Sequence, residues 1–231
     1  MWDEARDVAD YRAHRTMTGI VGGIPVTACS TGSGGPSAAS AVEELSELGA
    51  RTFVRIGTTG AIQPEIQCGD LIITEAAIRR DGTSDQYVDS HYPAAADCLV
   101  TMALIEAAER LGVRYHVGVT CCTAAWYTGQ GRPGYGGYWQ SWMDGLVADM
   151  QRAKVLNFEM EGSTVLVLAR LFGLRAGSIL AVVANRVTDT FEYKGIEECC
   201  RVGIEAVKIL ARWDELVQQR GKTRWYPSLG S

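Results

Sequence analysis

Runs of apolar residues alternate with apolar stripes of helical spacing along the 231-residue chain. The short apolar runs predict strands at 16–20, 24–29, 51–56, 71–74, 115–120, 155–158 and 178–184. Helical spacing predicts helices at 36–48, 94–111, 163–172 and 196–217, and a weaker one at 138–152. Strand, glycine-rich turn, helix and strand follow one another from 24 to 56, which predicts a βαβ unit in an α/β protein.

The two ends of the chain carry no such pattern. Residues 1–10 mix acids with Trp2 and Val8, and we expect a short helix or a loose start. Residues 221–231 contain Pro227 and Gly230 and predict a loose tail. Because no repeat or linker interrupts the pattern, 1–231 is predicted to be a single domain.

Composition and charge narrow the class of protein. The net charge of −5 argues against nucleic-acid binding, since no basic field is present. No apolar run is long enough to span a membrane, so we expect no membrane partner. The chain has seven cysteines, an odd number without a C-x-x-C pair, and three histidines. This pattern favours reduced thiols in the cytoplasm and no metal site.

The first candidate for chemistry is Arg55, which interrupts an apolar strand just before a Gly-Thr-Thr-Gly stretch at 57–60. We expect this stretch to form a turn. Glycine lets a ligand approach the backbone, threonine offers hydroxyls, and arginine offers a charged fork suited to phosphate. The stretch therefore predicts an anion site, although Arg55 pairing with a structural glutamate is an alternative.

The second candidate is the loop from Trp126 to Arg132. An aromatic ring stacks on a flat base, Gln130 offers an acceptor and two donors, and Arg132 offers donors alone. Together they match the carbonyl, N–H and carbonyl edge of uracil. An ordinary polar surface loop is the alternative.

The third candidate is the stretch 157–162, in which Glu159 and Glu161 lie between an apolar strand and an apolar helix. Buried glutamates are rare unless they are paired or functional. These carboxylates are candidates for binding sugar hydroxyls. The alternative is a helix N-terminus at which the dipole favours acids.

The order of these stretches resembles the uridine phosphorylases of the nucleoside phosphorylase-I superfamily. The resemblance rests on STGSGGPS, VRIGTTGAIQPEIQCGDLIIT, the Gln-Gly-Arg loop, NFEMEGST and VVANR. It covers nearly the whole chain from Tyr11. It implies a three-layer α/β/α sandwich around a mixed, partly barrel-like sheet. The implied reaction converts uridine and phosphate to uracil and ribose 1-phosphate in a homo-oligomer, with phosphate as co-substrate and no cofactor.

The resemblance also implies roles for individual residues, of which Arg55, Arg132 and Glu161 are the implied catalytic residues. Phosphate would be bound by Arg55, Thr58 and, from a neighbouring subunit, Arg12. The base would be bound by Trp126, Gln130, Arg132 and Arg186, and the ribose by Thr59, Gly60, Met160, Glu161 and Glu159. Asn185-Arg186 stands where purine-specific relatives carry Ser-Asp, which favours a pyrimidine. Ala13 stands where some bacterial members carry a glutamate at a cation site, so no such ion is expected.

One part of the family pattern has no counterpart in the chain. Members usually begin with a strand and a Gly-Asp-Pro-x-Arg loop that supplies a second phosphate arginine, and 1–10 contain neither. We therefore expect an open edge or gap in the sheet. This departure leaves two alternatives to a phosphorylase, a hydrolase of the same superfamily and an inactive nucleoside-binding paralogue.

Overall fold

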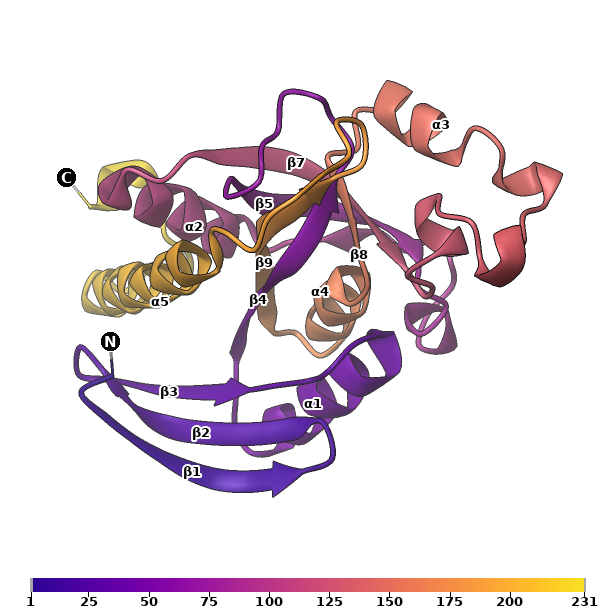
Figure 1. The fold of residues 1–231 in the computed structure, drawn as a ribbon. Coiled ribbons are helices and arrows are strands. Elements are labelled where there is room, and N and C mark those ends of the chain that lie inside the picture. The colour runs from indigo at the N-terminus through magenta and orange to yellow at the C-terminus, as the bar shows by residue number, and fades with distance from the viewer. Residues whose placement is uncertain (1, 231) are drawn as a thin grey trace.

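A computed structural model describes residues 2–230, and its centre is a closed ring of five strands (Figure 1). The ring runs β4–β8–β7–β5–β9 and returns to β4 through parallel pairing of β9 with β4. Its members are β4 Thr52–Ala61, β5 Leu71–Arg80, β7 Tyr115–Thr123, β8 Asn157–Glu159 and β9 Arg175–Asn185. The short strands β6 Ala94–Ala95 and β10 Thr190–Phe191 extend this sheet. The expected mixed, partly barrel-like sheet is confirmed.

Helices cover the ring on opposite sides. The helices are α1 Gly35–Glu47, α2 Cys98–Leu111, α3 Leu146–Arg152, α4 Gly162–Leu171 and α5 Ile196–Gln219. One core joins α2 and α5 to β5 and β9, and another joins α1 and α4 to the sheet. Helix α3 packs through Leu146 against Phe158 of β8. The α/β/α layering is therefore as expected, and no helix within residues 2–230 is long and apolar enough to cross a membrane.

Two local predictions are wrong. Residues 57–60 form no turn, because β4 runs unbroken from Thr52 to Ala61 along β9, with a register shift between Thr59 and Gly60. The predicted βαβ unit also fails, since the strand before α1 belongs to a separate sheet. That sheet has the order β1–β2–β3, with β1 Glu4–Tyr11, β2 His14–Val21 and β3 Ile24–Cys29. The glycine hairpin between β2 and β3 is confirmed.

The predictions for the chain ends are also wrong. Residues 4–11 form β1, which pairs with β2. In the tail, the ring of Trp225 stacks on Trp213 of α5 at 4.1 Å between centroids, and Leu229 is buried. Residues 1 and 231 lie outside the described part. That 1–231 folds as one domain stays a prediction.

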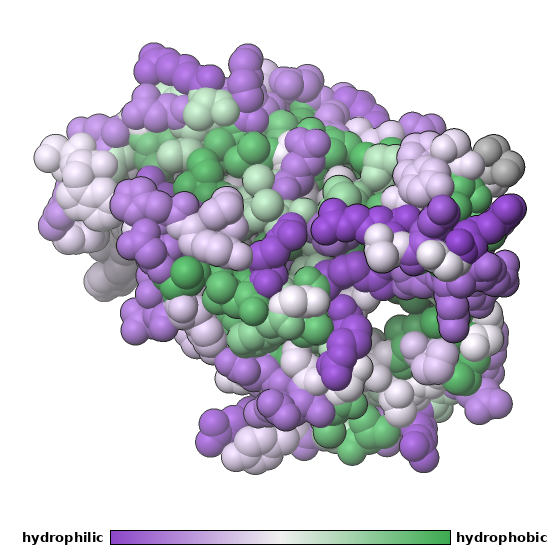
Figure 2. Space-filling view, turned by 180° about the vertical axis from the view of Figure 1, so that it is seen from behind, coloured by the Kyte–Doolittle hydropathy of each residue, from purple (hydrophilic) through white to green (hydrophobic). Residues whose placement is uncertain are grey.

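The expected open edge is present within residues 2–230. Strand β4 pairs with β8 through Gly60 and Ala61 alone, so its edge from Thr52 to Thr59 has no strand beside it. Strand β3 pairs with β2 on one side and has a free second edge in the same described range. Figure 2, seen from behind, shows an opening between the lower part of the molecule and the body above it.

A buried carboxylate fixes where α4 begins. Asp81, just after β5, accepts hydrogen bonds from Ser84, from Ser163 Oγ at 2.6 Å and from Thr164 Oγ1 at 2.8 Å. Burial alone would raise the pKa of Asp81, but these bonds outweigh it and lower the pKa below its ordinary value of 3.8. Asp81 therefore joins the end of β5 to the first turn of α4.

We expect Asp81→Asn to lower the free energy of unfolding by about 2 kcal/mol at pH 7, because charge-assisted hydrogen bonds are lost. A lowered folded-state pKa means that the unfolded state binds more protons, so stability rises with pH through this range. The wild type should therefore lose its extra stability over Asp81→Asn as the pH falls from 3.8, the ordinary pKa of an aspartate, through the lowered pKa of folded Asp81. Urea unfolding at neutral and acidic pH measures this difference. Asp149→Asn, at an exposed residue of α3, is the control and should change little. An advantage that stays constant with pH would contradict the assignment.

Candidate functional site

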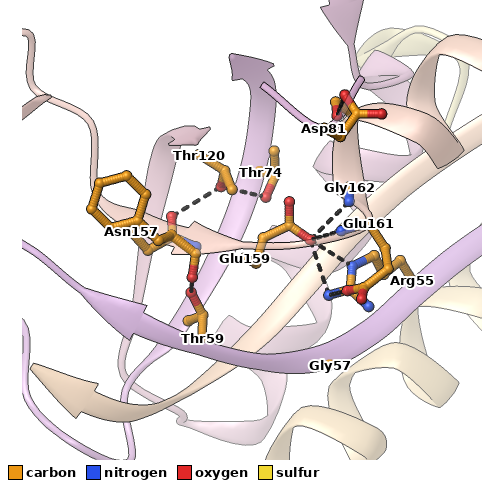
Figure 3. A network of polar contacts seen from close by, with 12 residues as sticks. Arg55, Gly57, Thr59, Thr74, Asp81, Thr120, Asn157, Glu159, Glu161 and Gly162 are labelled. Carbon is orange, nitrogen blue, oxygen red and sulfur yellow. Dashed lines mark hydrogen bonds and ion pairs between the residues drawn. The ribbon is translucent and has the colours of Figure 1, made fainter. Parts of the chain in front are cut away.

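Arg55, Glu159 and Glu161 form an ion-pair cluster where β4, β8 and α4 meet (Figure 3). Arg55 Nε and Nη2 lie 3.0 and 2.9 Å from Glu159 Oε2, and Nη2 lies 2.5 Å from Glu161 Oε2. The side chains of Arg55, Glu159 and Glu161 are 13%, 1% and 8% exposed. Arg55 thus pairs with two glutamates, as the alternative interpretation expected, and the anion site stays a prediction. These ion pairs bring the first and the third candidate stretches, which contain Arg55 and the two glutamates, together at one place.

The backbone around this cluster supplies further donors. Glu159 Oε2 also accepts the backbone N–H of Glu161 at 2.8 Å and of Gly162 at 2.7 Å. Glu161 Oε1 accepts the backbone N–H of Gly34, in the glycine loop before α1. A side chain on Gly57 would lie 2.8 Å from Arg55 Nη1, so this glycine lets the guanidinium lie across the strand. The glycine loop, β4 and the start of α4 therefore converge on the cluster of Arg55, Glu159 and Glu161.

The guanidinium of Arg55 stays protonated. Burial alone would lower the pKa of its guanidinium, but Coulomb attraction to Glu159 and Glu161 and the hydrogen bond to Glu159 raise that pKa above the ordinary value. One cation faces two carboxylates, so this end of the site can be expected to need additional positive charge before it binds an anion strongly.

A chain of buried hydroxyls and one amide supports the same strands. Thr74 and Thr120 hydroxyls lie 2.8 Å apart, and Thr120 donates to Asn157 Oδ1. Asn157 Nδ2 donates to Thr59 Oγ1, which itself donates to the carbonyl of Phe158 at 2.7 Å. Figure 3 shows this chain beside the ion-pair cluster. The Thr59 hydroxyl therefore both donates and accepts within the protein.

Gln130, Arg132 and Arg186 gather at the far end of β4. Arg186 Nη2 donates to Gln130 Oε1 at 2.6 Å, its Nη1 donates to the Gln130 carbonyl at 2.8 Å, and Gln130 Nε2 donates to Thr123 Oγ1. The Gln130 side chain is buried, and its amide orientation is fixed by these partners. The guanidinium of Arg132 lies 5.8 Å from the ring centroid of Trp126, an exposed residue of the same loop.

Arg186 links this group to the strands. Burial lowers its pKa to about 10, and the nearby charge of Arg132 adds to the effect. A side chain on Gly60 would lie 3.2 Å from Arg186 Nε, which is buried without a hydrogen-bond partner in the described structure. The guanidinium also lies 5.9 Å from the ring centroid of Phe158, the residue before Glu159. Gly60 and Phe158 are register partners, so the amide–guanidinium group and the ion-pair cluster lie along the same two strands.

The remaining predicted site residues lie around this core. Thr58 is exposed on β4, and Met160 is half-buried between the two glutamates. Arg12 has a φ of 56° in the turn between β1 and β2, and its guanidinium lies over the ring of Tyr11. That turn is joined to the glycine loop by a 2.7 Å hydrogen bond from Ser30 Oγ to the Ala13 carbonyl.

Sequence reasoning missed two contributors, Gly34 and Asn157. The glycine loop at 30–37 predicts a turn, but nothing local indicates a backbone contact with a residue 127 positions away. Asn157, an amide inside an apolar strand, was an available signal for a buried polar network.

A cavity of about 640 Å³ lies elsewhere, between α1 and 81–87, and its walls include Glu43, Glu44 and Asp81. Acidic walls make it unsuited to an anion.

Comparison with known proteins agrees with this geometry. The model of the phosphorylase superfamily matches residues 4–212. A uridine phosphorylase of Thermococcus kodakarensis is 56% identical over 229 residues, which cover 99% of this chain and 83% of that protein. A uridine phosphorylase of Escherichia coli is 42% identical, covering 91% and 83%. A guanosine phosphorylase of Halorubrum lacusprofundi is 39% identical, covering 80% and 71%. The chain belongs to the phosphorylase superfamily.

Proposed function

We propose that the protein catalyses phosphorolysis of uridine to uracil and ribose 1-phosphate. The observation that carries the proposal is the position of Gln130, Arg132 and Arg186 at one end of β4 and β8, the two strands that also hold Arg55 and Glu159. The uridine phosphorylases among the relatives support it.

Base recognition follows from the hydrogen bonds that Gln130 has left to offer. Its Nε2 donates one hydrogen to Thr123, and its Oε1 accepts one from Arg186. One donor and one lone pair remain, which match a carbonyl and the adjacent N3–H of uracil. Arg132 would bind the second carbonyl, and Trp126 would cover one face of the ring. A guanine edge presents a different order of donors and acceptors, so this set favours uracil.

The chemical step needs charge stabilisation at both ends. A phosphate oxygen attacks C1′ of the ribose while the C1′–N1 bond breaks, and the electron pair of that bond leaves with uracil. Donors on the uracil carbonyls stabilise the departing anion, which takes up a proton at N1. Phosphate bound near Arg55 offsets the positive charge that develops on the ribose, and Glu161 would hold the ribose hydroxyls. Orientation and preorganised charge suffice without a covalent intermediate.

The proposal is tested by measuring uracil release from uridine with and without phosphate. We expect release to require phosphate and to exceed release of guanine from guanosine at equal concentration. Equal release without phosphate would identify a hydrolase. Uridine binding without turnover in either condition would identify an inactive nucleoside-binding protein.

Assembly and location complete the proposal. Two carboxylates outnumber the one guanidinium of Arg55, so a second cation from another subunit would strengthen phosphate binding. Arg12, exposed in its turn beside the glycine loop, is our candidate for this second cation in a homo-oligomer.

We place the protein in the cytoplasm, in keeping with seven cysteines that are all free thiols.

A further inference from the structure

The two carboxylates on Arg55 contact different parts of its guanidinium. The group presents a side fork, made of Nε and Nη2, and an end fork, made of Nη1 and Nη2. Glu159 Oε2 accepts from both members of the side fork. Glu161 Oε2 lies at Nη2 and so occupies half of the end fork. A phosphate that binds the end fork with two oxygens needs the position that Glu161 holds.

The two carboxylates also differ in how firmly they are held. Glu159 is 1% exposed, and the oxygen that binds Arg55 also accepts two backbone N–H groups, from Glu161 and Gly162. Glu161 is 8% exposed, and its two oxygens contact Arg55 Nη2 and the Gly34 backbone N–H. A guanidinium and a glycine N–H are both donors that bind anions. Glu161 therefore holds the donors that an incoming phosphate would use.

We infer that Glu159 is a fixed positioning residue for Arg55, whereas Glu161 is an exchangeable carboxylate that moves from Arg55 to the ribose hydroxyls when a nucleoside binds. The inference rests on the proposed function. Its consequence is positive coupling between nucleoside binding and phosphate binding, since the nucleoside draws away the carboxylate that competes with phosphate for the end fork of Arg55. Reciprocity requires that phosphate strengthen nucleoside binding by the same factor.

The same loss of charge should then have opposite effects at the two positions. Glu161→Gln removes the competitor, so phosphate alone should bind more tightly and the coupling should disappear. Glu159→Gln also removes a negative charge, but it releases the side fork of Arg55, so phosphate should bind more weakly. An account based on net charge alone predicts tighter binding in both variants.

The experiment is calorimetric titration of the full chain with inorganic phosphate, alone and with pseudouridine. Pseudouridine carries both ribose hydroxyls on a carbon–carbon glycosidic bond that phosphorolysis does not break. We expect it to tighten phosphate binding about tenfold in the wild type, within the usual range of coupling. The 2′,3′-dideoxy form of pseudouridine should give no coupling. We expect about tenfold tighter binding of phosphate alone to Glu161→Gln and about tenfold weaker binding to Glu159→Gln.

Asp81→Asn is the matched control. Asp81 is a buried carboxylate that holds the first turn of α4 through Ser163 and Thr164, and its hydrogen bonds do not involve Arg55. Its phosphate affinity and coupling should equal those of the wild type. A general disturbance of this helix would weaken phosphate binding in the control as well, and that result would overturn the inference.

Two further results would overturn it: a shift in the same direction for both glutamate variants, and equal effects of pseudouridine and its dideoxy form on the wild type. The second comparison needs no variant, so it decides the question even where Glu159→Gln does not fold. Uracil release by the same preparation distinguishes failure of this inference from failure of the proposed function. A chain that releases uracil with phosphate but shows no coupling contradicts the inference alone, whereas a chain that releases none contradicts the proposed function.

Discussion

Replacing Arg132 with alanine should lower kcat/KM for uridine phosphorolysis about a hundredfold, or roughly 3 kcal/mol, because the proposed charged donor to the departing uracil is lost. The Arg132 guanidinium lies over the Trp126 ring, 5.8 Å from its centroid, and its charge adds to the burial that lowers the pKa of nearby Arg186. The fold should persist, since the arginine is half-buried in a loop outside the sheet. The circular dichroism spectrum and the melting temperature should therefore stay close to those of the wild type.

One control and one further readout accompany this variant. Arg110→Ala removes a surface arginine of α2 that pairs with Glu106 and Glu205, and it should leave turnover unchanged. In Arg132→Ala the pKa of Arg186 should rise, because a neighbouring positive charge is gone. Near-normal turnover of Arg132→Ala would contradict the assignment of this residue to the base.

Replacing Arg55 with methionine should have the largest effect on stability. Glu159 and Glu161 would be left buried without their cation, and breaking a buried ion pair costs about 3–5 kcal/mol. For a chain of this length we expect the melting temperature to fall by about 10 °C. Turnover should fall as well, since the proposed phosphate contact is lost.

A triple variant separates these two effects. Adding Glu159→Gln and Glu161→Gln to Arg55→Met removes the unpaired charges, so much of the lost stability should return while turnover stays low. Thermal unfolding and uracil release measure the two quantities on the same samples. Stability that does not return in the triple variant would mean that Arg55 acts through packing rather than through charge.

The central sheet was largely predictable because its strands are apolar and its helices carry clear stripes. The turn predicted at 57–60 failed for a physical reason. Glycine and threonine are local turn signals, but ten register pairs with β9, from Thr52 to Ala61, outweigh a local preference. Local pattern cannot report such long-range pairing.

The chain ends failed for a related reason. Every residue of β1 is exposed, so the strand lacks the alternation by which strands are recognised. The tail is held by Trp225 stacking on Trp213, a contact between segments whose sequences give no sign of each other. In both places tertiary contacts, and not local composition, fix the structure.

The candidate site was predictable in its members but not in its connections. The sequence identifies Arg55 and the two glutamates from separate stretches, and it allows both an anion site and an ion pair for Arg55. The structure shows the ion pair, and the proposed function uses the same guanidinium for phosphate. Which fork of the guanidinium each carboxylate occupies depends on the placement of β4 against β8, which no single stretch encodes.

The central claim is that phosphate, and not water, attacks the ribose. Its most direct test is uridine turnover in ¹⁸O-labelled water with unlabelled phosphate, followed by mass analysis of the sugar product. We expect ribose 1-phosphate in equal amount to uracil, with no ¹⁸O at C1′. Free ribose that carries ¹⁸O at C1′ would contradict the account.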